Sequence, residues 1–169
     1  MLWEIEGIGA RYSSVAIDGA MIYTMGRKKG TWLISRDAAT GAHHWETFIT
    51  DVGAEPCSTP TVDGDRGFAV TREGTLFCAD VSDGSEVWRR DFIHDFGGDY
   101  MAHEGGGGYS ESVLIDGDRL ICTPGAKDGV VAALNKETGE VVWKTPFPSD
   151  GGTQGIDAAG FSSVVISHA

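Results

Sequence analysis

The sequence predicts an all-β fold, a β-propeller built from four-stranded antiparallel blades, and three observations lead to it. A motif of an acidic or amide residue, three spacers, Gly, three spacers and Trp occurs three times, and its tryptophans, Trp45, Trp88 and Trp143, are 43 and 55 residues apart. An Asp-Gly pair between apolar runs precedes each copy. No stretch shows sustained helical periodicity. Repetition of short-stranded units at this period is typical of propeller blades.

The repeated motif extends to a small residue two positions before the acidic or amide residue. We predict that all twelve positions are structural. They are Ser35, Asp37, Gly41 and Trp45 in the first copy; Cys78, Asp80, Gly84 and Trp88 in the second; and Ala133, Asn135, Gly139 and Trp143 in the third. Because Cys78 stands where the other copies have Ser or Ala, we interpret it as a packed small residue rather than a reactive thiol.

The Asp-Gly pairs, at 18–19, 63–64 and 116–117, predict hairpin turns between a first and a second strand. We expect type I′ turns, which need a positive φ at both central positions. From each of these glycines to the motif glycine the chain runs 22, 20 and 22 residues (Gly19 to Gly41, Gly64 to Gly84, Gly117 to Gly139). This near-constant spacing indicates one fixed supersecondary unit.

Each unit contains four predicted strands in order, rich in β-branched and aromatic residues and separated by Gly-containing turns. The first strands are 13–17, 59–62 and 112–115, and the second strands are 21–24, 67–70 and 120–123. The third strands are 32–35, 76–79 and 130–133, and the fourth strands carry the motif Trp. Residues 161–169 resemble another first strand, and Trp3 places 1–7 as a last strand.

These elements predict a single, partial propeller over residues 1–169. Its blade pieces are 1–7, 12–50, 56–93, 109–148 and 161–169. Three complete units are fewer than the four blades with which propellers typically close, so we expect the remaining blades in a longer chain. The alternative is a small self-closing propeller in which the two end pieces form one incomplete blade.

Composition excludes several classes of protein. The formal net charge of −12 argues against nucleic acid or an anionic membrane as the main partner. No apolar run reaches the ~20 residues of a transmembrane helix, and no signal peptide is visible in this chain. Cys57, Cys78 and Cys122 form no CxxC pair. We expect Cys122 to be packed in a strand and Cys57 to be accessible, with their redox state left open.

The unit small-x-Asp-x-x-Thr-Gly-x-x-x-Trp resembles the tryptophan-docking motif of the PQQ-type (pyrroloquinoline-quinone) β-propeller repeat, over nearly the whole chain. The resemblance implies that each Trp packs between blades against the small residue and that the Gly makes a tight turn. Departures are mild: Ser82-Asp83-Gly84 replaces Thr-Gly, and Asn135 replaces Asp.

Proteins with this repeat include quinoprotein dehydrogenases, the outer-membrane assembly lipoprotein of Gram-negative bacteria, and exported bacterial proteins that bind no quinone. Segments 108–112 and 122–125 look most like the last group. The resemblance therefore implies a periplasmic or extracytoplasmic bacterial protein.

Antiparallel strand order predicts where a binding face lies. The turns between second and third strands and the connections between blades must emerge on the same face. The first-to-second and third-to-fourth turns, which are short and acidic, must emerge on the other face. Five of the thirteen basic residues lie in the three turns between second and third strands, and the connection from Trp88 to Ser112 is the longest at 24 residues. Long loops on a rigid scaffold are where binding residues concentrate. The candidate binding residues are Arg27, Lys28, Lys29, Arg72, His94, Asp95, Asp99, His103, Glu104 and Lys127.

No catalytic constellation emerges from residue spacing. The long connection contains five possible N/O metal ligands: His94, Asp95, Asp99, His103 and Glu104. Their spacing fits no ligand signature, and the Gly-rich flanks suggest a mobile surface loop. We therefore predict no metal. Gly105 to Gly108 lack the Lys and the following helix of a phosphate-binding loop.

Two functions remain open. The first is a non-catalytic scaffold without a cofactor that binds a protein or small-molecule ligand through its long loops. The alternative is a PQQ-dependent alcohol-type dehydrogenase, which would need PQQ, calcium ligands, a catalytic Asp and a ring-stacking Trp. Trp32 stands alone outside the repeat positions and is a poor stacking candidate on a third strand.

Overall fold

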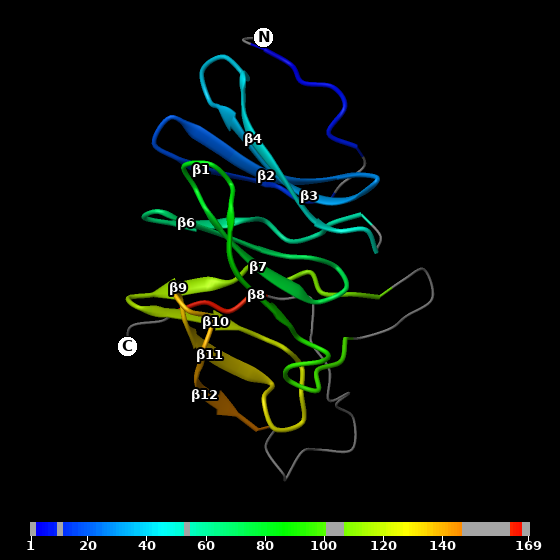
Figure 1. The fold of residues 1–169 in the computed structure, drawn as a ribbon. Helices are drawn as coiled ribbons and strands as arrows, with labels where there is room; N and C mark the ends of the chain where they lie inside the picture. The colour runs from blue at the N-terminus through cyan, green and yellow to red at the C-terminus, as the bar shows by residue number, and fades with distance from the viewer. Residues whose placement is uncertain (1–2, 10–11, 53–54, 101–106, 147–162, 167–169) are drawn as a thin grey trace.

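The computed structural model describes residues 3–9, 12–52, 55–100, 107–146 and 163–166. These residues form three four-stranded antiparallel sheets, each in the strand order of the chain. The first blade contains β1 (Val15–Asp18), β2 (Met21–Lys28), β3 (Gly30–Asp37) and β4 (His43–Thr50); the second contains β5 (Thr61–Asp63), β6 (Arg66–Val70), β7 (Thr75–Asp80) and β8 (Glu86–Asp91); and the third contains β9 (Leu114–Asp116), β10 (Arg119–Cys122), β11 (Val131–Asn135) and β12 (Val141–Thr145). The predicted all-β class is confirmed. The three sheets follow one another face to face (Figure 1).

The Asp-Gly hairpins lie where the sequence predicts them, but their turn type differs. Asp18 is the last residue of β1 and pairs with Met21 of β2, so the two loop residues are Gly19 and Ala20. Only Gly19 has a positive φ, of 55°, since among the described residues every positive φ belongs to a glycine. A two-residue turn with Gly first is type II′, and the predicted type I′ is wrong.

The motif turn between third and fourth strands depends on its acidic or amide residue. In the first blade Asp37 Oδ1 accepts hydrogen bonds from the backbone N–H groups of Ala39 (3.1 Å) and Thr40 (2.7 Å). In the third blade the Asn135 side-chain oxygen accepts from the two corresponding N–H groups. A side-chain oxygen that bonds the backbone two residues on is what makes Asx residues common in turns. Asn therefore replaces Asp here without loss of the turn.

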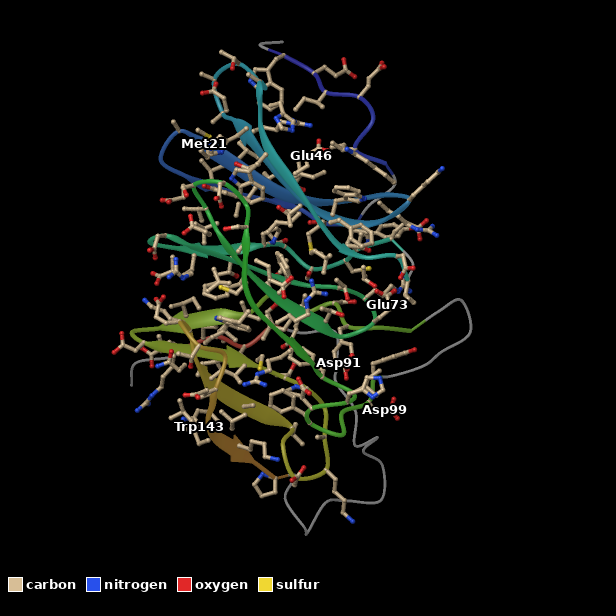
Figure 2. All side chains as sticks on the ribbon, in the orientation of Figure 1. Met21, Glu46, Glu73, Asp91, Asp99 and Trp143 are labelled. Carbon is tan, nitrogen blue, oxygen red and sulfur yellow. The ribbon has the colours of Figure 1, made fainter. Side chains whose placement is uncertain are left out.

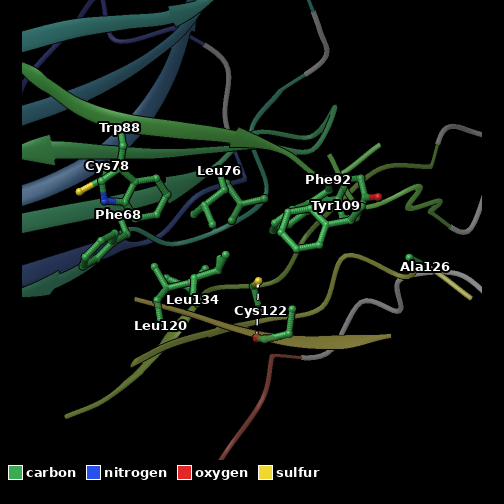
Figure 3. Close-up of a cluster of buried hydrophobic side chains, with 14 residues drawn as sticks. Phe68, Leu76, Cys78, Trp88, Phe92, Tyr109, Leu120, Cys122, Ala126 and Leu134 are labelled. Atoms are coloured by element: carbon green, nitrogen blue, oxygen red, sulfur yellow. Dashed lines mark hydrogen bonds between the residues drawn. The ribbon is translucent and has the colours of Figure 1, made fainter. Parts of the chain in front are cut away.

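The core lies between the sheets in two clusters. One joins the first and second blades around Tyr23, Met25, Leu33 and Phe77. The other joins the second and third blades, where Phe68 and Trp88 face Leu120 and Leu134 (Figure 3). Cys78 and Cys122 are fully buried there, and burial raises the pKa of both thiols. Cys57 is half-buried rather than fully accessible, and all three cysteines are free thiols.

Two of the three motif tryptophans, Trp45 and Trp88, are each held by two blades at once, whereas Trp143 is 38% exposed. Trp45 lies opposite Ser35 in its own sheet, and its indole N–H donates to the Val81 carbonyl of the second blade at 2.8 Å. Its ring covers Gly84, where an added Cβ would lie 2.6 Å from ring carbon. We call the motif glycine, with the carbonyl one residue after the motif acidic or amide residue, the docking slot of a blade.

The same slot recurs at two further positions. Trp88 donates to the Lys136 carbonyl of the third blade at 3.0 Å and covers Gly139. Trp3 donates to the Ala38 carbonyl of the first blade at 3.0 Å and covers Gly41. Trp3 thus takes the position of a preceding blade's motif Trp. A last strand was predicted at residues 1–7, but its described part, 3–7, is not in a strand. In residues 3–9, which we call the strap, only Gly9 forms an isolated bridge, to Arg27.

Hydroxyl side chains link the starts of neighbouring first strands. The Thr59 N–H donates to Ser112 Oγ at 3.0 Å, and the Ser112 N–H donates to Ser163 Oγ at 2.9 Å. Ser163 therefore stands beside the third blade as Ser112 stands beside the second. Residues 163–166 are not in a strand, and the rest of the predicted strand 161–169 lies outside the described residues. No helix in the described part of the chain is long and apolar enough to cross a membrane.

Candidate binding face

Two edges of the stacked sheets differ in character. The turns β2–β3 and β6–β7, the β10–β11 loop and the blade-to-blade connections emerge at one edge, which we call the long-loop edge. The Asp-Gly turns emerge at the other. Figure 2 shows Glu73, Asp91 and Asp99 on the side of the long-loop edge, away from Met21 at the start of β2. The candidate binding residues that the structure describes all belong to the long-loop edge or to the strand ends beneath it.

The β2–β3 hairpin is tighter than predicted. Arg27 and Lys28 belong to β2 rather than to a loop, because Gly30, with a φ of 93°, reverses the chain immediately after Lys29. Arg27 forms an ion pair with Glu55 (Nη1 to Oε1, 3.4 Å). Lys28 pairs with the Glu46 carboxylate and lies 5.6 Å from the Trp32 ring centroid. Lys29 is exposed and has no ion-pair partner within the described ranges.

Arg72 has a structural contact at each end of its guanidinium group. Its Nε donates to the Gly107 carbonyl at 2.8 Å, and its Nη1 lies 3.7 Å from Cys57 Sγ. Any side chain at Gly108 would collide with Arg72, since an added Cβ would lie 2.2 Å from its Cγ. Arg72 therefore joins the first and second blade-to-blade connections, and only part of its charge remains for a ligand.

The long insertion after β8 begins as a compact turn. Asp91 Oδ1 accepts from the N–H groups of Ile93 (2.9 Å) and His94 (2.8 Å), while Phe92 and Phe96 are buried beneath. Phe92 packs edge-on against Tyr109, with ring centroids 5.1 Å apart. The start of the insertion is thus fixed to its end by a buried aromatic contact.

The predicted residues of the insertion are only partly described. His94, Asp95 and Asp99 are exposed at the long-loop edge, and His103 and Glu104 lie outside the described residues. Where the structure describes the chain, no three His, Cys, Asp or Glu side chains lie close enough to hold a metal ion. Lys127 is exposed in the β10–β11 loop.

Three exposed apolar side chains share this edge and were not predicted. Tyr12, Val52 and Ile93 are 74%, 60% and 39% exposed. Tyr12 lies between the strap and β1, and Val52 and Ile93 lie in the connections that lead from one blade to the next. Single exposed apolar residues are ordinary on protein surfaces. Val52 lies between the predicted blade pieces 12–50 and 56–93, and Tyr12 and Ile93 are end residues of those two pieces.

A buried carboxyl group also escaped the sequence analysis. Glu111 is 1% exposed, and burial raises its pKa to about 7 even though both of its oxygens accept from the Thr123 N–H at 2.9 Å. The corresponding positions of the first and second blades hold Ser13 and Ser58, which are also buried. Alignment of the three first strands on their Asp-Gly pairs would have revealed this substitution of a carboxyl for a hydroxyl.

The opposite edge is acidic but internally paired. Arg66 of the second blade forms ion pairs with Asp65 (3.1 Å) and with Glu137 of the third blade (3.0 Å). Lys136 pairs with Asp63 at 2.5 Å, and this hydrogen bond raises the pKa of Lys136. The contacts of Arg66 with Glu137 and of Lys136 with Asp63 join two blades, so part of the negative charge at this edge serves the fold.

Comparison with known proteins identifies the repeat. A family model described as outer membrane protein assembly factor BamB matches residues 29–166. The outer membrane protein assembly factor BamB of Shewanella oneidensis is 33% identical over 85 residues, which cover 50% of this chain and 21% of that protein. The chain thus spans about a fifth of the length of this curated relative.

Solved structures with the same fold have more than one function. BamB from Moraxella catarrhalis superposes with a TM-score of 0.60 at 24% identity, covering 82% of this chain and 37% of that one. Quinohemoprotein alcohol dehydrogenase from Comamonas testosteroni gives a TM-score of 0.61 at 17% identity, covering 82% and 21%. These likenesses confirm the β-propeller fold. They leave the function to be argued from the residues of this chain.

Proposed function

The chain belongs to the PQQ-type propeller-repeat family described as outer membrane protein assembly factor BamB, and from that premise we propose that it is a non-catalytic scaffold. It binds a protein partner through the long-loop edge, and it works outside the cytoplasm without a cofactor.

One observation supports this proposal above the others. The long-loop edge combines exposed apolar side chains (Tyr12, Val52 and Ile93) with exposed cationic or titratable ones (Lys29, His94 and Lys127). Apolar and aromatic anchors surrounded by polar groups are the usual composition of a protein-binding surface.

The loops that carry these groups are held at their bases. Arg72 bonds Gly107, Tyr12 N–H donates to the Pro56 carbonyl at 2.9 Å, and Tyr109 Oη donates to the Pro124 carbonyl at 2.9 Å. A surface fixed before binding loses less conformational freedom when a partner docks. This suits a scaffold whose loops present a set shape.

The likeness to a quinohemoprotein dehydrogenase makes PQQ the second candidate, but the described residues fit it poorly. A quinone needs an aromatic face to stack on. Trp32 packs edge-on with Phe48, at 5.3 Å between centroids, and Lys28 lies over its ring.

Crosslinking tests the proposal. A photoreactive amino acid placed at Val52 or Ile93 in the full chain, in its native cell, should give the same discrete adduct from both positions. A probe at Asp118, exposed at the opposite edge, is the matched control. Reversing the charge of Lys29 and Lys127 should weaken the adduct. Equal adducts from both edges, or none at the long-loop edge, would refute a partner at this surface.

A thermal melt with PQQ and calcium separates the two functions. A ligand that binds only the folded state adds about 2.7 kcal/mol of stability at a hundredfold excess over its Kd. A shift of that size would favour the dehydrogenase. We expect the midpoint not to move.

A further inference from the structure

Glu111 makes a contact that recurs in all three blades with different chemistry. Six residues before the glycine of each Asp-Gly pair lies a buried polar residue that bonds the chain six residues after that glycine; the bonded pairs are Ser13 with Met25, Ser58 with Val70, and Glu111 with Thr123. The two serine hydroxyls stay neutral, whereas a carboxyl can lose its proton. The third blade therefore has a titratable group where the other two have neutral ones.

Glu111 and Tyr109 together hold the end of β10. Both Glu111 oxygens accept from the Thr123 N–H at 2.9 Å, and Thr123 Oγ1 donates to the same carboxylate. Tyr109 Oη donates to the carbonyl of the next residue, Pro124, at 2.9 Å. Both holding side chains are buried. Two side chains, two residues apart, thus fasten one short segment, and we call this arrangement of residues 109, 111, 123 and 124 the latch.

The latch joins the insertion after β8 to the third blade. The Tyr109 ring packs edge-on against Phe92 at the start of the insertion (Figure 3). Gly98, within the insertion, lies so close to the latch that an added Cβ would be 2.2 Å from the Pro124 carbonyl oxygen and 2.9 Å from Tyr109 Oη. Movement at the end of β10 would therefore move the insertion, which carries Ile93 at the long-loop edge.

Within the described part of the chain, Glu111 has no ion-pair partner among the Lys and Arg side chains. The titratable groups on the elements packed around it are neutral or negative: Tyr109, Cys122, Asp91 and Asp99. Arg72, on the adjoining β6–β7 turn, bonds Gly107 and Cys57 instead. A buried carboxylate without a cation is costly, so ionisation favours any arrangement that lets water reach it.

We propose that the latch makes the long-loop edge pH-sensitive: protonated Glu111 holds the insertion to the third blade, and ionised Glu111 releases it. As regulation of the surface to which we assign a protein partner, this rests on the proposed function. In the released form the carboxylate is hydrated and the end of β10 moves away from Tyr109. The partner surface keeps its fixed shape at low pH and loses it as pH rises.

The size of the effect follows from proton binding. In the released form the carboxyl ionises as an ordinary Glu, with a pKa near 4.5, whereas burial in the latch raises the pKa of Glu111 to about 7. Each pH unit between these values favours release about tenfold, and above about pH 7 the effect levels off. The population of the released form should therefore rise by more than about tenfold between pH 5 and pH 8.

Alkylation of the cysteines measures release directly. Cys122 is fully buried at the end of β10, next to Thr123, so release uncovers it, whereas Cys78 is fully buried in the second blade, away from the latch. N-ethylmaleimide should therefore label Cys122 faster than Cys78 in the full chain, as followed by peptide mass spectrometry. The ratio of the Cys122 rate in wild type to that in Glu111→Gln should rise more than about tenfold between pH 5 and pH 8. The reactivity of the exposed thiol is the same in both proteins and cancels.

Tyr109→Phe tests the other half of the latch. It keeps the ring against Phe92 and removes the hydrogen bond to the Pro124 carbonyl. Labelling of Cys122 should become faster at every pH, with the same dependence on pH as in wild type. If Tyr109→Phe leaves the Cys122 rate unchanged, Tyr109 does not hold the end of β10.

Two other results would overturn the proposal. If Cys122 and Cys78 are labelled equally fast in wild type, opening is global and there is no latch. If the ratio of wild type to Glu111→Gln is constant with pH, Glu111 does not control opening. None of these rates requires a partner, so the latch can fail while the proposed function stands.

The Ile93 crosslink connects the latch to the partner. In cells held at pH 6 and at pH 8, the wild-type adduct should weaken at pH 8, and the adduct of Glu111→Gln should persist. Wild-type adducts of equal strength at both pH values would show that the latch does not regulate the partner surface. Absence of an adduct from both proteins at both pH values would refute the proposed function, and with it the regulatory role, even if the thiol rates establish the latch.

Discussion

Glu111→Gln isolates the effect of one buried ionisation on stability. Gln keeps the size of the side chain and an oxygen that accepts from the Thr123 N–H, but it cannot ionise. The native carboxyl is 1% exposed, and burial raises its pKa from the usual 4.5 to about 7. At about 1.4 kcal/mol per pH unit, this difference amounts to about 3 kcal/mol between the protonated and ionised forms.

The sign follows from proton binding. Between pH 4.5 and about 7 the folded protein keeps the Glu111 proton that the unfolded chain has lost. The free energy of unfolding therefore falls as pH rises through this window. Below this pH window the Glu111 carboxyl is protonated in both the folded and the unfolded protein, and above it the carboxyl is ionised in both. Relative to wild type, Glu111→Gln should gain about 3 kcal/mol between about pH 4 and pH 8.

Urea denaturation of both proteins across that pH range measures the difference. Other titrating groups act equally on the two proteins and cancel. Glu140→Gln, which removes an exposed carboxyl at the Asp-Gly edge, controls for the loss of one negative charge. If the wild-type and Glu111→Gln curves run parallel with pH, the carboxyl is hydrated in solution and the argument from burial is wrong.

The docking slots give two matched pairs of predictions. Trp88→Ala truncates a buried aromatic and should cost about 3–5 kcal/mol of unfolding free energy, whereas Trp143→Ala, at an exposed site, should cost less than about 1 kcal/mol in dilute solution; equal losses would contradict the assigned joints. Gly84→Ala and Gly64→Ala both force a positive φ on Ala, at 77° and 60°. Only the Cβ at position 84 would collide with Trp45, at 2.6 Å, so chemical denaturation should show Gly84→Ala to be the costlier by about 1–3 kcal/mol.

The blades could be predicted because their signals are local and repeated. Strand composition, a Gly at each turn and a near-constant spacing all lie within one unit of the chain. The type of the Asp-Gly turn could not be derived, because it depends on whether Asp18 ends a strand or belongs to the turn. That choice is made by its pairing with Met21.

The position of the long-loop edge could be predicted, but which of its charged groups remain unpaired could not. Antiparallel order is enough to collect the long loops at one edge. Which charges stay free depends on contacts between distant segments, such as Arg72 with Gly107. The burial of Glu111 likewise depends on how the blades pack, which the spacing of residues in one strand does not reveal.

The docking slots also explain how blades with different sequences can fit one another. Within the described residues, the carbonyls that accept from tryptophan belong to Ala38, Val81 and Lys136. Their side chains share neither size nor charge, because the bond is made to the main chain that every residue possesses. The joint thus specifies a tryptophan on one side and little more than a glycine on the other. A blade could be exchanged for another, or copied, without redesigning its neighbours, and the rest of its surface is free to change.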